Sequence, residues 1–418
     1  MRYIADLHIH SKYSRACSKN LDLEHNEIWA KKKGIQIVGT GDFTHPVWFK
    51  ELKEKLVEDK PGLFKLKESD GKVLFMLTAE LSCIYKQGDK VRRIHLCVFA
   101  PSFESVEKIV AALLKRGVNI SSDGRPIMGL HADELTKIIL EADKYCMVIP
   151  AHAWTPWFSV FGSNSGFDTL EECFGEMTKY IYGIETGLSS DPPMNWRLSM
   201  LDNLTLISNS DAHSSANLGR EANVFEIDEE KLSYDEIYRI IKDKDKKNFL
   251  YTIEFFPEEG KYHHDGHRSC NINFTPQESN KNKDICPICK KKLTIGVLNR
   301  VDVLADRDEG FEPKNIIPFK SLVPLPEVIS EILEVGKNSK KVQAAYEEII
   351  EKGGSEFEIL LDRSYEEIEA IGSPEIAMAI KNIRENRVEP VAGYDGVYGV
   401  IKAIKPGQIL KPEQKSLI

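Results

Sequence analysis

Short apolar runs alternate with longer segments of helical pattern from the start of the chain to about residue 255. Seven runs have the length of a buried strand: YIADLHI, IQIVGTG, VLFMLTA, RIHLCVFA, CMVIPAH, IYGIETG and LTLISNS. Residues 102–117 and 131–145 have amphipathic helical spacing, with Ser102 and Asp133 near the expected helix starts. Repeated alternation of strand and helix predicts an α/β fold built on a largely parallel sheet or barrel.

The pattern changes after residue 255. Residues 260–300 hold three histidines and three cysteines, a proline-punctuated stretch follows, and helical patterns run from about 327 to 388. The last section is Gly-rich and reads as a turn that feeds a small hairpin. We therefore expect a barrel over 1–255, a zinc-binding module over 256–305 and, over 306–418, a linker, a helical region and a C-terminal hairpin and tail.

Composition and charge narrow the class of protein. The chain has 418 residues, of which 42% are hydrophobic and 29% charged, as in ordinary globular proteins. A formal net charge of −9 argues against a non-specific nucleic-acid coat protein. No run approaches the roughly 18 apolar residues that a membrane span needs, and the start lacks a signal-peptide pattern. We expect a cytoplasmic protein with no membrane partner.

Residues that commonly bind metals fall at or near the end of each expected strand. They are His8, His10, Asp42, His45, Glu80, His95, His152, Glu185, Asp211 and His213. In a β/α barrel the strand ends converge on one face, so the spacing predicts a single cluster. Imidazoles mixed with carboxylates suit Zn²⁺, Mn²⁺ or Fe²⁺ better than Mg²⁺ or Ca²⁺. Two metals about 3.5–4 Å apart support in-line phosphoryl displacement, so phosphoester hydrolysis is the expected chemistry.

The motifs DLHIH, GTGDFTH, LTAE, RIHL, PAHA and NSDAH, in this order over residues 1 to about 225, resemble the polymerase and histidinol phosphatase (PHP) superfamily. The resemblance implies a PHP-type distorted (β/α)7 barrel with two or three divalent metals (Zn, Mn, Fe or Mg). By that resemblance one metal is held by His8, His10, Glu80 and Asp211, a second by Glu80, His95 and His152, and a third by His213 with His45 or Asp42. Glu80 and Asp211 are the expected catalytic residues, around a hydroxide held between the metals that Glu80 bridges. The third site is less regular, because two residues separate the aspartate and histidine that are usually adjacent in the superfamily.

A second motif lies between residues 260 and 300. His267-x-x-Cys270 is followed, after fifteen residues, by Cys286-x-x-Cys289. Two ligand pairs at such spacing form a tetrahedral zinc site. His263 is an alternative to His267 in the first pair. A closed site of this kind holds one structural zinc and folds a segment too short for its own core.

The PHP-like region followed by GKYHHDGHRSC, CPIC, LTIGVLNRV and GYDGVYG resembles the endonuclease Q family over nearly the whole chain. That resemblance implies a metal-dependent DNA-repair endonuclease. Its substrate would be DNA with damaged bases, cut on the 5′ side of deoxyuridine, deoxyinosine, deoxyxanthosine or an abasic site. One alternative is a PHP-type phosphomonoesterase acting on a small metabolite, to which a zinc module and a helical region would be odd additions. Another is a DNA-binding scaffold that has lost its metals, against which the full ligand set argues.

An enzyme that acts on a single damaged base usually flips it out of the stack, so aromatic contacts are expected. Trp154 and Trp157 follow His152, and Lys12 and Tyr13 follow the first motif, which makes them candidate substrate-binding residues. The final residues, KPEQKSLI, begin like the clamp-binding peptide of DNA-replication proteins but end before its aromatic pair. A sliding clamp is therefore a candidate partner, and a frayed C-terminus is the alternative.

Overall fold

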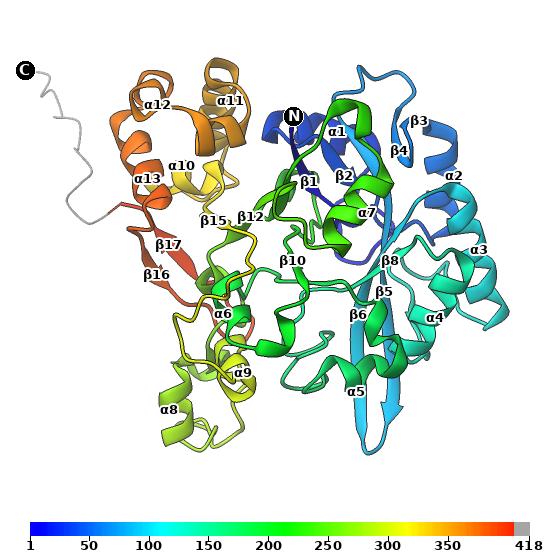
Figure 1. Cartoon of the computed structure of the whole chain (residues 1–418). Helices are drawn as coiled ribbons and strands as arrows, with labels where there is room; N and C mark the ends of the chain where they lie inside the picture. Colours follow the sequence, from blue (N-terminus) through cyan, green and yellow to red (C-terminus); the bar gives the residue numbers. More distant parts are fainter. Residues whose placement is uncertain (405–418) are drawn as a thin grey trace, which may run out of the picture.

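The computed structural model describes residues 1–404 of the chain. The expected clamp-binding peptide lies outside the described residues. The fold is mixed α/β around a central sheet, with a group of helices stacked at one end of it (Figure 1). None of the described helices combines the length and the apolar character that crossing a membrane requires.

The main sheet has eleven strands. They are β1 (Arg2–Asp6), β2 (Ile37–Gly39), β3 (Leu56–Lys60), β4 (Leu63–Leu66), β5 (Leu74–Gln87), β6 (Lys90–Ala100), β7 (Ile127–Met128), β8 (Met147–Pro150), β11 (Ala222–Glu226), β12 (Phe249–Phe255) and β15 (Phe319–Leu322). Their order is β15-β12-β11-β1-β2-β5-β4-β3, with β6 between β5 and β8 and with β7 beside β5. A separate parallel pair is formed by β9 (Gly183–Glu185) and β10 (Thr205–Ile207).

All seven apolar runs of the sequence form strands, but the sheet is not largely parallel. β1 pairs with β2, and β2 with β5, in parallel. In contrast, β5 with β6, β6 with β8, and β1 with β11 are antiparallel. The cause is local, because Gly88, with φ +59°, and Asp89 join β5 to β6 in a tight turn that leaves no room for a crossover helix. The hydrogen-bonded path through the described strands is open, so it does not close into a ring.

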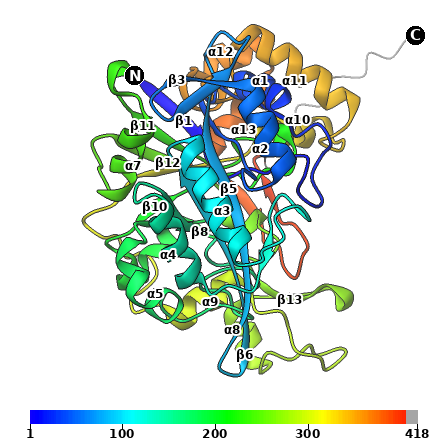
Figure 2. The same ribbon diagram turned by 90° about the vertical axis from the view of Figure 1, so that its right-hand side faces the viewer.

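Helices flank this sheet over the first 255 residues. They are α1 (Leu23–Lys33), α2 (Pro46–Lys55), α3 (Phe103–Lys115), α4 (Ala132–Ala142), α5 (Leu170–Phe174), α6 (Pro192–Trp196) and α7 (Tyr234–Lys242). Figure 2 shows α2, α3 and α4 along one flank of β5. Ser102 caps α3, as the sequence predicts, by accepting a hydrogen bond from the backbone N–H of Ser105.

The strand period determines which core each side chain enters. Along β1 and the residue after it, Tyr3, Ala5 and Leu7 pack into one buried cluster, whereas Ile4 packs into the other. Successive side chains of a strand point to opposite faces. The even-numbered histidines after β1 therefore share a face, and that face holds the site described below.

The second half of the chain returns to the same sheet. Its short elements are β13 (Asp265–His267), β14 (Ile272–Phe274), α8 (Pro276–Lys281) and α9 (Val297–Leu304). β15 then pairs in parallel with β12, so the sheet extends beyond residue 255. The expected helical region is formed by α10 (Leu325–Leu333), α11 (Lys340–Gly353), α12 (Tyr365–Ile371) and α13 (Pro374–Arg384), and the expected hairpin by β16 (Glu389–Val391) and β17 (Val400–Lys402). In Figure 1 this hairpin lies between the helical group and the segment of α8 and α9.

Candidate active site

Three strands, β1, β5 and β6, deliver four side chains to one buried cluster. His8 and His10 follow β1, whereas Glu80 and His95 lie within β5 and β6 and not at their ends. The difference from the expected strand-end positions arises because the β5–β6 hairpin continues past the cluster to its turn at Gln87–Lys90. Antiparallel pairing places Glu80 and His95 beside each other, with 2.6 Å between Glu80 Oε1 and His95 Nδ1.

The first group of possible metal ligands contains His8, His10, Glu80 and Asp211, one ligand atom of each lying within 4.8 Å of the others. His10 Nε2 lies 3.0 Å from Asp211 Oδ1 and 3.4 Å from Glu80 Oε2. His8 Nε2 is buried and makes no hydrogen bond within the described residues, although it lies 3.7–3.8 Å from the same two carboxylates. A buried ring nitrogen without a hydrogen bond, among carboxylates, fits a metal ligand.

The second group shares Glu80 with the first. Glu80 Oε1 lies 2.6 Å from His95 and 3.0 Å from His152, and Arg125 donates a 2.7 Å hydrogen bond to Glu80 Oε2. Burial alone would raise the pKa of Glu80, but the Arg125 guanidinium and hydrogen bonds from His10 and His152 hold it well below its usual range. Burial lowers the pKa of His95 to about 4, so its imidazole is neutral and its lone pair is free to bind a metal.

Two carboxylates outside these groups orient the histidines. Glu185 lies 2.9 Å from His8 Nδ1 and accepts the backbone N–H of His152 at 2.7 Å. Asp42 lies 3.2 Å from His10 Nδ1. A proton held on Nδ1 leaves Nε2 to face the cluster, which is the usual arrangement around metal-binding histidines. Asp42 therefore supports His10, whereas the sequence analysis expected it to bind a metal directly.

The third metal site expected from the sequence is not assembled. Over residues 1–404, no set of three possible ligand atoms that lie within 4.8 Å of one another includes an atom of Asp42, His45 or His213. His45 is the N-cap of α2. The two residues between Asp42 and His45 place the histidine at the start of this helix. His213 lies near the first group, with its ring 4.7 Å from that of His10, and is partly exposed to the cavity.

The backbone is strained at three residues of this centre. Asp42, His152 and Asp211 have φ values of 49°, 29° and 46°. Non-glycine residues in this region cost about 1–3 kcal/mol each and are concentrated at functional sites. At His152 the bend is tightly packed, since a Cβ on Gly187 would lie 2.7 Å from His152 Cβ.

A cavity of about 750 Å³ opens above the cluster. Its cationic lining residues are Arg93, Arg125, Arg220 and Lys261, and its aromatic ones are Trp157, Phe158, Tyr262 and Tyr398. The ring of Trp157 packs edge-on against Tyr262 at 5.9 Å, and Lys261 Nζ lies 4.8 Å from the centre of the Tyr398 ring. The mouth is therefore basic and aromatic on a chain whose formal net charge is −9.

The candidate substrate-binding residues have different positions. Trp157 lines the cavity. Trp154 instead lies in the core, 1% exposed, where its Nε1 donates a 2.7 Å hydrogen bond to Asn195. Lys12 and Tyr13 both bind Glu51 and do not line the cavity.

Sequence reasoning missed Arg125 as a partner of Glu80, and it did not foresee the orienting role of Glu185. The position of Glu185 at the end of a predicted strand was a usable signal, whereas Arg125 lies in the segment before β7 and carries no motif. Tyr398 also had no signal, because it reaches the cavity from the C-terminal hairpin.

The expected zinc ligands lie together in the second half of the chain. They are His267, Cys270, Cys286 and Cys289, each with one ligand atom within 4.8 Å of the others. Lys290 and Asn271, which follow the two ligand pairs, have positive φ values of 61° and 55° and turn the chain sharply there. His263 lies apart from this group, is buried near the Ser189 carbonyl, and has a pKa that burial lowers to about 4. The geometry thus selects His267 over His263.

Comparison with known proteins identifies a family model and relatives. The model described as the MJ0043 C-terminal domain matches residues 324–387. The uncharacterized protein MJ0043 of Methanocaldococcus jannaschii is 33% identical over 260 residues, which cover 62% of this chain and 32% of that protein. The match therefore spans about a third of the length of that relative.

Two solved structures are similar over the full length. One is the lesion-specific endonuclease PfuEndoQ from Pyrococcus furiosus, with 33% identity, a TM-score of 0.86, and coverage of 100% of this chain and 98% of that one. The other is endonuclease Q in complex with a 27-mer duplex substrate that has an abasic lesion at its active site. It has 33% identity, a TM-score of 0.87, and coverage of 100% of both chains.

Proposed function

This chain belongs to the endonuclease Q family of phosphodiester hydrolases, and from that premise we propose that it is a metal-dependent DNA-repair endonuclease. It cuts the phosphodiester on the 5′ side of deaminated bases (deoxyuridine, deoxyinosine, deoxyxanthosine) and of abasic sites. The observation that carries this proposal is the cavity, which combines a histidine and carboxylate cluster at its base with a basic, aromatic mouth.

We infer a PHP-type centre with two divalent metals (Zn, Mn, Fe or Mg). The ligands are His8, His10, Glu80 and Asp211 for one metal and Glu80, His95 and His152 for the other. Such metals, when bound, neutralise developing charge on the phosphoryl group and make water more acidic. The protein contributes the fixed geometry, because Glu185 and Asp42 each hold one histidine by its Nδ1 atom.

The lining of the cavity supports recognition of a nucleotide. Arg93, Arg220 and Lys261 offer charge-assisted hydrogen bonds to phosphates on either side of the scissile bond. Trp157 and Tyr398 offer aromatic surfaces on which an extrahelical base or sugar can stack. Arg125 lies 2.7 Å from Glu80, so it is placed at the base of the cavity, where the reacting phosphate must enter.

A structural zinc in the second half of the chain completes the proposal. Residues 256–305 hold the four ligands, and a closed Cys3His site of this kind folds a short segment. The C-terminal hairpin is fastened to this segment, because Asp395 accepts hydrogen bonds from Arg268 N at 2.8 Å and Thr294 Oγ1 at 2.7 Å. The zinc segment therefore helps to place Tyr398 at the mouth of the cavity.

The test is an incubation of the protein with an end-labelled duplex that contains one deoxyuridine, beside an undamaged duplex. We expect nicking on the 5′ side of the deoxyuridine that requires added metal, stops with a chelator and is lost in Asp211→Ala. Asp228→Ala is the matched control, since Asp228 is exposed, pairs with Lys231 and follows the end of β11 that pairs with Arg2, at the opposite end of β1 from His8. It should cut as the wild type does.

The same assay separates the competing functions. Turnover of a small phosphomonoester without nicking of the damaged duplex would overturn the endonuclease proposal and favour a metabolite phosphatase. Equal nicking of both duplexes would retain the hydrolase but refute lesion specificity. Metal-independent nicking, or activity retained in Asp211→Ala, would contradict the assignment of the cluster as the reacting centre.

A further inference from the structure

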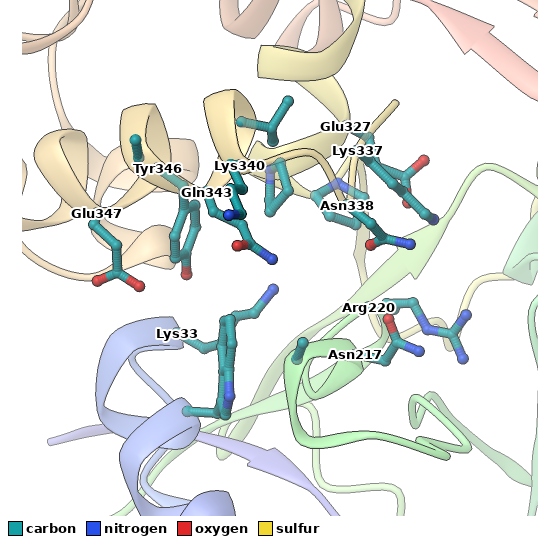
Figure 3. Close-up of a pocket in the computed structure, with 16 residues that line it drawn as sticks. Lys33, Asn217, Arg220, Glu327, Lys337, Asn338, Lys340, Gln343, Tyr346 and Glu347 are labelled. Carbon is teal, nitrogen blue, oxygen red and sulfur yellow. The ribbon is translucent and has the colours of Figure 1, made fainter. Parts of the chain in front are cut away.

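A second groove lies beside the catalytic cavity, between α1 and the helices α10 and α11. It has a volume of about 540 Å³. Figure 3 shows Lys33 rising from α1 toward Gln343 of α11, with Asn217 and Arg220 on the lower side of the same space. The groove therefore separates the first 255 residues from the region that matches the MJ0043 C-terminal domain model.

The groove and the catalytic cavity are neighbours. Asn217 and Arg220 line both spaces, so these two residues form a boundary that the groove and the cavity share. Arg220 lies just before β11 and donates a 2.8 Å hydrogen bond to the Ser210 carbonyl, close to Asp211 in sequence. A strand of DNA whose phosphate enters the cavity would thus pass Arg220 on its way into the groove.

The charge of the groove suits a phosphate. Four cations line it, namely Lys33, Arg220, Lys337 and Lys340, of which the buried Lys33 is already paired with Glu356 at 2.8 Å. Two carboxylates, Glu327 and Glu347, also line the groove. Both carboxylates are engaged, Glu327 by Lys337 at 2.8 Å and Glu347 by Lys32. Within residues 1–404 Arg220 and Lys340 make no ion pair, and the buried Arg220 Nε makes no hydrogen bond. These two cations keep donors free for a ligand.

The remaining lining suits a nucleobase. At one side of the groove the half-buried ring of Trp29 packs 6.1 Å from the ring of Tyr346, which is only 3% exposed, so Trp29 offers the accessible aromatic surface. Asn217, Asn338 and Gln343 offer amides, which both donate and accept hydrogen bonds as the edges of bases do. Aromatic surface, amides and unpaired cations together are the features by which proteins bind single nucleotides of a strand.

We propose that this groove binds one unstacked nucleotide of the DNA strand that is cut, next to the nucleotide in the catalytic cavity. Its phosphate lies between Arg220 and Lys340, and its base lies against the amides and the ring of Trp29. The inference rests on the proposed function in one respect, that DNA is the substrate. It gives the C-terminal helical region a role in holding the strand.

The first test measures binding to a duplex with one abasic site by fluorescence anisotropy, in an Asp211→Ala background so that the DNA stays intact. Lys340→Glu should weaken binding by about three- to tenfold at moderate salt and reduce the salt slope by about one counterion. Lys341→Glu is the matched control, because Lys341 is the exposed neighbour in α11, carries the same charge and does not line the groove. Equal effects of the two variants would refute a specific phosphate contact.

The second test locates the nucleotide. Lesion duplexes are shortened one nucleotide at a time on either side of the lesion, and each is bound by the protein with and without Lys340→Glu. We expect one nucleotide whose removal weakens binding to the protein that retains Lys340 but does not weaken binding to the Lys340→Glu variant. The reason is that the effects of removing two groups that contact each other do not add. Additive losses at every position would overturn the proposal.

A free nucleotide carries the same phosphate and base as a nucleotide of the DNA strand, so it is the alternative ligand for this groove. Calorimetric titration with a deoxynucleoside monophosphate therefore accompanies the truncation series. Binding that Lys340→Glu abolishes, together with additive truncation losses, would show that the groove takes a free nucleotide and would refute its assignment to the cut strand. Failure of the nicking assay would leave these binding results interpretable, because none of them depends on turnover.

Discussion

His8 Nδ1 lies 2.9 Å from a carboxylate oxygen of Glu185, which also accepts the backbone N–H of His152 at 2.7 Å. One buried carboxylate therefore holds a residue from each of the two ligand groups. Glu185 acts on the site without contacting a metal, because it determines which ring nitrogen of His8 faces Glu80 and Asp211.

Glu185→Gln should lower the affinity of the protein for divalent metal by about tenfold or more, because loss of an orienting carboxylate typically costs 10–100-fold. The amide preserves the volume of the side chain, so the fold should be retained. Metal titration by calorimetry on metal-free protein measures the effect, with circular dichroism to check the fold. Glu226→Gln, at an exposed position of β11, is the control. Unchanged metal affinity in Glu185→Gln would contradict the orienting role.

Two neighbouring tryptophans should separate stability from binding. Trp154→Ala removes a fully buried ring and should lower the free energy of unfolding by about 3–5 kcal/mol. Trp157→Ala removes a ring that lines the cavity, and should weaken binding of lesion DNA by about 1–3 kcal/mol with a smaller effect on stability. Urea unfolding and fluorescence anisotropy measure the two quantities. An unchanged free energy of unfolding in Trp154→Ala, with weaker DNA binding, would contradict the structural role of Trp154.

The positions that repeat with strand periodicity were predictable from the sequence. His8 and His10 share a face because they are two residues apart beyond a strand, and Glu80 comes to the same place because its apolar run forms β5. The zinc ligands were predictable for a different reason, since the two-residue gaps of His267-x-x-Cys270 and Cys286-x-x-Cys289 set the local geometry.

The parts that could not be predicted depend on contacts between distant segments. Arg125 reaches Glu80 from a loop, and Tyr398 reaches the cavity from a hairpin that begins at Glu389, far along the chain from the strands that hold the cluster. Asp42 was expected, as an alternative to His45, to join His213 at a third metal, and spacing alone does not reveal that Ser11 and Ser14 donate hydrogen bonds to Asp42 and that it lies beside His10. Such roles require the folded geometry.

Cys286→Ser should remove the structural zinc. The variant is expected to lose zinc from the second half of the chain and to become sensitive to protease within residues 260–300, because a segment held by a closed metal site unfolds without it. Cys17→Ser is the control, since Cys17 is a free cysteine outside the ligand group. Limited proteolysis with mass spectrometry locates the cut, and atomic absorption counts the zinc. Wild-type resistance in Cys286→Ser would show that the segment folds without zinc.

The contribution of two buried glutamates, Glu254 and Glu221, to the stability of the fold should fall as pH rises from about 5 to 8. Burial raises the pKa of Glu254 from 4.5 to about 8 and raises that of its neighbour Glu221 well above its usual range. Between pH 4.5 and about 8 the unfolded chain releases the Glu254 proton that the folded chain retains, so the contribution of Glu254 to the free energy of unfolding decreases by about 1.4 kcal/mol per pH unit. Glu221 acts in the same direction. Above pH 8 the contribution of Glu254 is constant.

Glu254→Gln tests this pH dependence, because an amide cannot release the proton. Thr186, Ser208 and Thr252 place their hydroxyls within hydrogen-bond distance of the Glu254 carboxyl, and an amide can keep these contacts. We expect a shallower decline of the melting temperature between pH 5 and 8, with the variant more stable than the wild type at pH 8. Glu226→Gln, on the exposed end of β11, should keep the wild-type slope. Parallel curves for the wild type and Glu254→Gln would mean that Glu254 is ionised in the folded protein throughout this range.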